Sequence, residues 1–255
     1  MIRLFQNSQK RWTMVVLSFV MVVLISACDK NKDNAPQPEN DAVCSKINIA
    51  GQVMCFSFNG NADDAVGNNK GTVEGATLTS DRKLNPNAAY QFNGTSDYIR
   101  VADPSHDFEG SISIVMWMFM DDQARETGAM RLFDTRNDTF TPNISLNAYF
   151  DLTNEQLEIG GLGLAEFHVD IDKGTWFQVA IVYDAETEDL EAYINAIELE
   201  AESNTFTGFT YDNEDFVIGA RADLRPGEMF HGKIDDVLVF NRALEETEIT
   251  SLLIQ

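Results

Sequence analysis

Short runs that alternate apolar and polar residues fill most of the chain after residue 42. The runs are rich in β-branched and aromatic side chains, and Gly, Asn, Asp and Pro separate them. A period of two is typical of strands with one buried face, and the separating residues are turn formers. We expect strands at 52–58, 88–92, 97–102, 111–120, 129–134, 144–152, 156–161, 165–171, 175–184, 190–199, 215–221 and 229–240.

The spacing of these runs indicates the fold class. They follow one another too closely for the helices that join parallel strands, so we expect antiparallel pairing. The pattern predicts an all-β fold, a two-sheet antiparallel jelly-roll sandwich. A short C-terminal helix is predicted at 245–254, where Ile249, Leu252 and Leu253 fall on one face.

The last predicted strand carries two adjacent carboxylates, in the sequence HGKIDDVLVF at 231–240. Strict alternation would place them on opposite faces of the strand: Asp236 with Ile234, Leu238 and Phe240, and Asp235 with Val237 and Val239. Both faces are then apolar. At least one aspartate therefore needs a partner inside the fold.

The N-terminus has the organisation of a secretory signal. An uncharged run at 14–27 follows three basic residues and is shorter than the roughly 20 residues of a spanning helix. It ends in Ile-Ser-Ala-Cys28, which resembles the bacterial lipobox, in which the cysteine is lipidated. We expect a lipoprotein signal peptide at 1–27, a lipidated N-terminus and flexible tether at 28–41, and one domain at 42–255.

This organisation predicts a lipid-anchored protein of the bacterial cell envelope, at the outer membrane or cell surface. The alternative is a plain signal peptide followed by an incidental cysteine. Either reading implies export, and an oxidising compartment favours a disulfide between the two remaining cysteines, Cys44 and Cys55. Their spacing suits a bridge across a hairpin, and two free thiols are the alternative.

The chain after residue 27 is strongly acidic. It holds 15 of the 18 basic residues and all 41 acidic ones, a net charge of −26. Such a field repels nucleic acid and anionic membrane surfaces, so we expect membrane contact through the lipid anchor only and no nucleic acid partner. The acids are dispersed among apolar residues, as on the surface of a folded domain.

Four segments, in order, resemble a LamG-like jelly-roll domain of the concanavalin A-like lectin/glucanase superfamily. They are FSFNGNADDAVGNNKGTVEGATL from residue 56, AYQFNGTSDYIRV from residue 89, GTWFQVAIVYD with AYIN from residue 174, and FHGKIDDVLVFNRALEETEI from residue 230. The resemblance covers Phe56 to Leu253. One departure is Ala196, which follows Asn195 where the family prefers glycine; because alanine with φ > 0 is costly, we expect a looser or longer hairpin loop.

The resemblance implies that the first and last strands of the domain lie side by side. The loop at 60–69 would then lie beside the two aspartates of the last strand. Calcium takes six to eight oxygen ligands. A structural Ca²⁺ site is therefore expected, with carboxylates from Asp64 and Asp235 and further oxygens from Asp63, Gly67 and Asn69.

The alternative to calcium is that Asp235 only accepts hydrogen bonds from the neighbouring loop. In either case Asp236 is expected to face the other surface of the sheet. There it would pair with Arg242 or accept a hydrogen bond from a backbone N–H.

No catalytic motif stands out. The glucanases of this superfamily carry their carboxylates as E-x-D-x-x-E on one strand, and the sequence has no such spacing and no G-x-S-x-G elbow. We therefore expect a non-catalytic protein. A glycoside hydrolase with an unrecognised carboxylate pair is the third reading.

Aromatic residues give the remaining candidates. Trp117, Phe119 and Trp176 lie inside strand patterns and are expected in the core. Tyr149, Tyr211 and Phe230 lie in or near loops and could contact a ligand, with ordinary packing as the alternative. The favoured function is a surface-anchored, calcium-supported module that binds glycan or glycoconjugate, and the alternative is a structural or adhesive lipoprotein that binds another protein.

Overall fold

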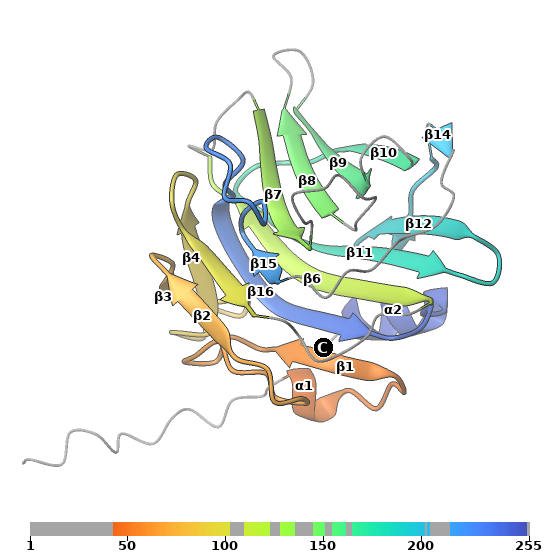
Figure 1. Ribbon diagram of the computed structural model, residues 1–255, viewed down its shortest axis with the longest axis horizontal. Coiled ribbons are helices and arrows are strands. Elements are labelled where there is room, and N and C mark those ends of the chain that lie inside the picture. The colour runs from red at the N-terminus through yellow and green to blue at the C-terminus, as the bar shows by residue number, and fades with distance from the viewer. Residues whose placement is uncertain are drawn as a thin grey trace, which may run out of the picture. The chain divides into compact units, whose positions relative to one another are not determined.

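The computed structural model describes residues 43–102, 110–122, 128–135, 145–150, 155–161, 165–201, 203–204 and 215–253 (Figure 1). Residues Asn40–Gln255 form one compact unit. The predicted signal peptide and tether, with Cys28, lie outside the described residues. Within the described part of the chain, no helix has the length and apolar character needed to cross a membrane.

The described residues form two antiparallel sheets of eight strands each. The first sheet has the order β13-β12-β11-β6-β16-β4-β3, and β1 also pairs with β16. Its strands are β1 (Gln52–Phe56), β3 (Thr77–Thr79), β4 (Ala89–Asn93), β6 (Ile112–Met120), β11 (Trp176–Asp184), β12 (Asp189–Ile194), β13 (Ile197–Glu198) and β16 (His231–Phe240).

The second sheet has the order β14-β10-β9-β8-β7-β15-β5-β2. Its strands are β2 (Gly71–Glu74), β5 (Tyr98–Val101), β7 (Gly128–Asp134), β8 (Ser145–Phe150), β9 (Glu155–Gly161), β10 (Ala165–Asp170), β14 (Ser203–Asn204) and β15 (Phe216–Ile218). The predicted all-β, two-sheet antiparallel fold is confirmed, and every predicted strand has a counterpart, whereas β2, β3 and β14 were not predicted.

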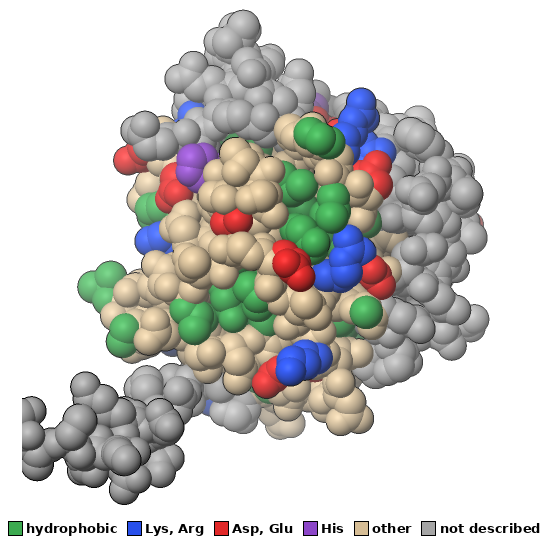
Figure 2. Space-filling view, turned by 60° about the vertical axis from the view of Figure 1, so that its left-hand side comes forward, with side chains coloured by type: hydrophobic (Ala, Val, Ile, Leu, Met, Phe, Trp, Pro, Cys, Tyr) green, Lys and Arg blue, Asp and Glu red, His purple; other side chains and the backbone are tan. Residues whose placement is uncertain are grey.

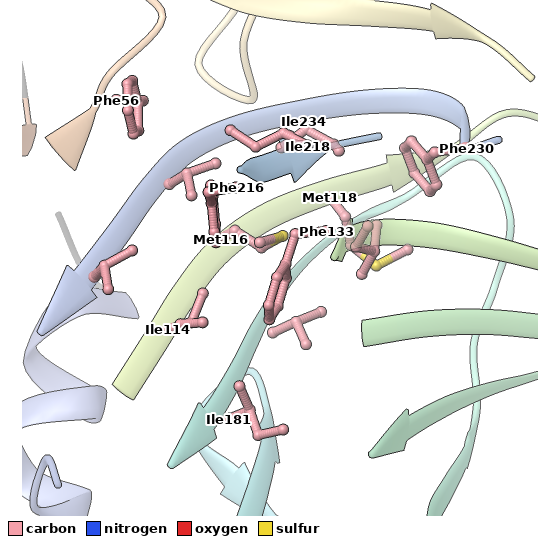
Figure 3. Packing of buried hydrophobic residues seen from close by; sticks show 14 of the residues in the cluster. Phe56, Ile114, Met116, Met118, Phe133, Ile181, Phe216, Ile218, Phe230 and Ile234 are labelled. Carbon is pink, nitrogen blue, oxygen red and sulfur yellow. The ribbon is translucent and has the colours of Figure 1, made fainter. Parts of the chain in front are cut away.

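The main core lies between the two sheets. Alternate residues of β6, among them Ile114, Met116 and Met118, point inward and meet Phe133 and Phe216 of the second sheet (Figure 3). The Phe133 and Phe216 rings stack at 5.4 Å. All five side chains are fully buried, each contributing roughly 1.5–3 kcal/mol by its removal from water.

A second, smaller core lies on the outer face of the first sheet. There Val115, Leu238 and Phe240 pack against Ile249 and Leu252 of the helix α2 (Glu246–Leu253). The C-terminal helix was predicted within one residue at each end. The helix α1 (Val43–Lys46), which was not predicted, joins the same cluster through Val43 and Cys44.

The predicted disulfide is present between Cys44 and Cys55, with Cα atoms 5.8 Å apart. It does not staple a hairpin, as the spacing suggested. Instead it ties α1 to β1, whose neighbour is the last strand, β16. The first and last strands of the domain thus lie side by side, as the resemblance implied.

The hairpin between β12 and β13 contradicts the expectation of a loose loop. Ile194 pairs directly with Ile197, so the loop has only two residues. Asn195 and Ala196 both have positive φ, 50° and 60°. This is the geometry of a tight type I′ turn, and Ala196 accepts the strain that glycine would avoid.

Candidate functional site

A β-bulge in β16 decides where the two adjacent aspartates point. Asp235 pairs with Trp117 and Leu238 with Val115, so three steps along β16 match two along β6. The extra residue shifts the alternation, and Val237 joins Ile234 in the main core while Leu238 faces the second core. The predicted placement of the aspartates on opposite faces was therefore wrong, because a bulge turns neighbouring side chains toward one side.

Arg82 is the partner that the aspartates need. Its Nη1 atom lies 3.0 Å from Asp235 Oδ2 and 2.5 Å from Asp236 Oδ2, and the arginine side chain is only 10% exposed. Its guanidinium carbon lies 4.4 Å from the centre of the Trp117 ring, a cation–π contact. The expected pair between Asp236 and Arg242 is wrong, since Arg242 binds Glu248 at the start of α2.

One guanidinium serves two buried carboxylates, and this sets their protonation. Burial raises the pKa of Asp235 well above its usual range, the neighbouring Asp236 raises it further, and Arg82 lowers it. Burial likewise raises the pKa of Asp236, against the opposing effect of Arg82. Burial and the closeness of the two carboxylates therefore favour protonation of the pair, and Arg82 opposes it.

Aromatic side chains cover the outer face of the first sheet beside this ion pair. Trp176 of β11 pairs with Phe119 of β6, and Phe119 pairs with Lys233 of β16. The rings of Phe119 and Trp176 lie 5.6 Å apart, and Lys233 Nζ lies 4.8 Å from the Phe119 ring. Trp117, one row further along, faces the same way.

These three aromatics were expected in the core, and the structure shows them on the outside and partly exposed. The alternation of residues in β6 already indicated this exposure. In ISIVMWMFM, residues 112–120, the even positions supply the core and the odd positions include both Trp117 and Phe119. Strict alternation over nine residues placed the two rings away from the core.

Gln178 contributes a buried polar group to this surface. It lies opposite Trp117 and is 1% exposed, and its Oε1 atom has no hydrogen-bond partner among the described residues. An acceptor left without a donor in this way costs about 1–3 kcal/mol. We call the surface formed by Gln91, Trp117, Phe119, Trp176, Gln178 and Lys233 the polar–aromatic face.

The predicted ligand-contacting aromatics have different outcomes. Phe230 is fully buried and packs against Phe92 in the main core, with ring centres 6.2 Å apart, so its prediction as a binding residue is wrong. Tyr149 belongs to β8, but its side chain lies outside the described residues, as does Tyr211. Those two stay predictions.

The residues predicted to bind calcium are held by protein partners. Asp64 Oδ1 accepts hydrogen bonds from the backbone N–H groups of Cys55 and Val66, and its Oδ2 accepts one from the Asn69 side-chain amide. Asp235 is bound to Arg82 and to the backbone N–H of Asp236. Both carboxylates therefore have hydrogen-bond or ion-pair partners within the protein.

The rest of the 60–69 loop agrees with this arrangement. The Asp63 side chain is exposed, and the backbone of Asp63 pairs with that of Lys70 in an isolated antiparallel β-bridge. A Cβ added to Gly67 would lie 2.5 Å from Asp64 Oδ2. Close packing between loop and carboxylate explains the glycine. Across the described ranges, no three His, Cys, Asp or Glu side chains are grouped to hold a metal ion. Calcium binding stays a prediction.

A second charged network lies on the outer face of the second sheet. Glu228 bonds to Arg131 at 3.1 Å and to Arg221 at 3.2 Å, and this fastens the loop between β15 and β16 to β7. Burial would raise the pKa of Glu228, but Arg131 and Arg221 outweigh it and lower that pKa. On the face drawn in Figure 2, basic side chains lie beside acidic ones and hydrophobic side chains form small separate patches.

The comparison with known proteins agrees with this architecture. A family profile described as the concanavalin A-like lectin/glucanases superfamily matches residues 93–250. The chain belongs to this superfamily. No relative was found among curated protein sequences.

Solved structures of the same fold include carbohydrate-related domains. Domain 4 of AbnA, a GH43 extracellular arabinanase from Geobacillus stearothermophilus, solved with arabinotriose, is 24% identical over 79% of this chain and 98% of its own, with a TM-score of 0.58. A botulinum neurotoxin type C structure, titled for cell entry dependent on two ganglioside molecules, is 12% identical over 80% and 51%, with a TM-score of 0.59. Trypanosoma rangeli sialidase is 17% identical over 80% and 32%, with a TM-score of 0.62.

Proposed function

We propose that this protein is a non-catalytic glycan-binding module and that its binding surface is the polar–aromatic face. The observation that carries the proposal is the position of Trp176, Phe119 and Trp117 on the outside of a sheet, next to the unpartnered Oε1 atom of Gln178. These rings are partly exposed although the same sheet has a full apolar core on its other side. Core formation therefore does not account for them.

The chemistry of the face suits a sugar. A pyranose or furanose has an apolar C–H face that can lie on an aromatic ring and hydroxyls at its edge that need donors and acceptors. Here Lys233 can supply donors beside the rings, while its neighbour on β4, Gln91, already donates an Nε2 hydrogen to Asp121 Oδ2 at 2.7 Å. Among the described residues, the Gln178 Oε1 atom is the buried acceptor without a donor, and a sugar hydroxyl that reached it would donate to it.

The similar structures support a carbohydrate ligand. The arabinanase domain was solved with a trisaccharide, and the neurotoxin structure concerns ganglioside molecules. Both facts belong to those proteins, and each shares only the fold with this chain. They make neutral oligosaccharides and glycolipid headgroups the first probes.

The proposal includes display on the cell envelope through a lipid at Cys28, for which the support is the Ile-Ser-Ala-Cys sequence. Metabolic labelling with an acyl analogue should mark the wild-type protein and leave Cys28→Ala unmarked. Equal labelling of the two proteins would remove the anchor from the account.

A glycan array that includes arabinotriose tests the binding function. The wild type should bind at least one oligosaccharide, and Trp176→Ala should weaken that binding by tenfold or more. Tyr98→Ala is the matched control, because Tyr98 is a partly exposed aromatic on the outer face of the other sheet. An array without any bound glycan, or equal binding by Trp176→Ala, would refute the proposal.

The same samples distinguish binding from hydrolysis. Each bound oligosaccharide is incubated with the protein and then chromatographed. The proposal expects intact sugar. Shorter products would replace the binding role by a glycosidase activity.

A further inference from the structure

The edge of the first sheet is incomplete next to β13. Strand β12 pairs with β11 along its whole length, but on its other side β13 reaches only Tyr193 and Ile194, with Leu199 donating to the Ala192 carbonyl. Among the described residues, no strand continues this pairing along Asp189–Glu191. We call these three residues the β12 edge.

Hydrogen-bond directions show that the β12 edge has backbone groups to offer. The Asn195 N–H points toward β11, where it meets the Gln178 carbonyl, whereas the Ala192 carbonyl points away from β11, toward Leu199. The direction alternates along an antiparallel strand. The N–H and carbonyl of Leu190, two residues before Ala192, therefore point away from β11, toward the open edge.

The chain leaves the edge at this point. After β13 it crosses to β14, which pairs with β10 of the second sheet. The β12 edge therefore lies beside the crossing from one sheet to the other (Figure 1). A cavity of about 780 Å³ opens there, lined by Phe167, Leu190, Leu199 and Ala201 together with acidic residues. Of these residues, Phe167 and Leu190 belong to the main core between the sheets, and Leu199 packs against it.

A second hollow, of about 370 Å³, lies on the other side of the same edge, on the outer face of the first sheet. It is walled by Thr187, Tyr193 and Leu244 and by acids from three segments: Asp184, Asp189, Glu191, Glu198, Glu245 and Glu246. Asp189, Glu191 and Glu198 line both hollows, and no basic residue lines either one.

We propose that the β12 edge binds an extended peptide that alternates basic and apolar residues and adds to the first sheet as a further strand. Side chains of an added strand point alternately to the two faces of the sheet. Its apolar residues would enter the 780 Å³ cavity beside Phe167 and Leu199, and its basic residues would enter the acidic hollow. Its backbone would bond to the N–H and carbonyl of Leu190, which point away from β11.

Charge distinguishes this occupant from a second copy of the chain. Open strand edges commonly pair with one another. Here each edge carries Asp189, Glu191 and Glu198, and each mature chain has a net charge of −26, so two copies repel. A partner strand must bring cations.

The test uses fluorescence polarisation of a labelled, end-blocked peptide with four lysines alternating with three valines, titrated with the full-length protein. A second peptide has glutamate in place of lysine. A third keeps the lysines and carries N-methyl groups on alternate residues, which removes the backbone donors along the edge that would face β12. The wild type should bind the first peptide at least tenfold more tightly than either of the others.

Protein variants separate the edge from general electrostatics. The double variant Glu198→Gln with Glu246→Gln should weaken binding of the lysine peptide at least tenfold. Its control, Glu74→Gln with Asp172→Asn, removes the same charge from exposed positions elsewhere and should change the affinity less than twofold. Equal loss in both double variants, equal affinity for the N-methylated peptide, or association of the protein with itself in place of peptide binding would overturn the proposal.

Discussion

Arg82→Gln is the substitution that most sharply tests the structural reading of the two adjacent aspartates. The change keeps a polar side chain of similar length and removes the cation that binds both Asp235 and Asp236. Those carboxylates are 2% and 6% exposed. Removing one partner of a buried ion pair costs about 3–5 kcal/mol, because it leaves a desolvated charge behind.

At about 2–4 °C per kcal/mol for a domain of this size, the melting temperature should fall by about 6–20 °C.

The pH dependence of the unfolding free energy gives a second readout. The pKa values of both aspartates are raised in the folded protein, so the folded state binds protons that the unfolded state has released. The stability that these two aspartates contribute is therefore lost as the pH rises from near 4, their pKa in the unfolded chain, through their pKa values in the folded protein.

Loss of Arg82 raises these pKa values further, so the deficit of the variant should be small in acid and largest at neutral pH. Adding Asp235→Asn to Arg82→Gln should recover part of the loss at pH 7, since it removes one of the two charges. The assay is thermal and urea unfolding at pH 4.5 and pH 7. Arg242→Gln is the control, because its pair with Glu248 is about one-third exposed and should be worth at most about 1 kcal/mol. The reasoning fails if Arg82→Gln costs no more than the control, or if its cost does not change with pH.

Four further predictions concern other parts of the molecule. Ala196→Gly should raise the free energy of unfolding by about 0.5–1 kcal/mol, because glycine adopts positive φ without strain; a urea titration that shows a loss would contradict the turn geometry. Glu228→Gln should cost about 1–3 kcal/mol of unfolding free energy at pH 7, because Arg131 and Arg221 lose their shared carboxylate. The pKa of Glu228 is lowered in the folded protein, so its contribution to stability is present above the unfolded pKa and is lost as the pH falls through the folded pKa. The unfolding free energies of variant and wild type should therefore become equal in acid. Cys44→Ser with Cys55→Ser should cost about 3 kcal/mol for a bridge across a sequence separation of 11 residues, and a melting temperature equal to that of the oxidised wild type would argue against it. If calcium binds at the 60–69 loop, millimolar Ca²⁺ should raise the melting temperature relative to EDTA in wild type and not in Asp64→Ala; identical wild-type melts would remove calcium from the account.

The sequence was sufficient for the strands, the antiparallel sandwich, the disulfide and the terminal helix, because each depends on local pattern or composition. It was misleading at β16, where alternation was carried through a bulge that only the pairing of Asp235 and Leu238 with β6 reveals. Arg82 could not be assigned to the aspartates, since 153 residues separate it from Asp235 and no local signal connects them. The tight turn at Ala196 also escaped prediction, because tertiary pairing of Ile194 with Ile197 overrides the residue's own preference.

The polar–aromatic face was not predicted, because its aromatic residues were assigned to the core side of their strands. Trp117 and Trp176 read as core residues because large aromatics in strands are usually buried. The alternation in 112–120 already placed Trp117 opposite the core, but only the packed structure shows that Trp117 and Trp176 stay partly exposed on the outer face. The prediction for Phe230 was wrong in the opposite sense. Its place near the start of a strand suggested an exposed side chain, but Phe230 packs against Phe92 in the core.

The most direct measurement for the central claim is intrinsic tryptophan fluorescence during a glycan titration. The chain has three tryptophans, and in Trp12→Phe the remaining two, Trp117 and Trp176, both lie on the polar–aromatic face. An oligosaccharide selected on the array should shift or quench their emission with the same midpoint as binding measured by calorimetry. Binding detected by calorimetry with unchanged tryptophan emission would place the glycan elsewhere and contradict the account.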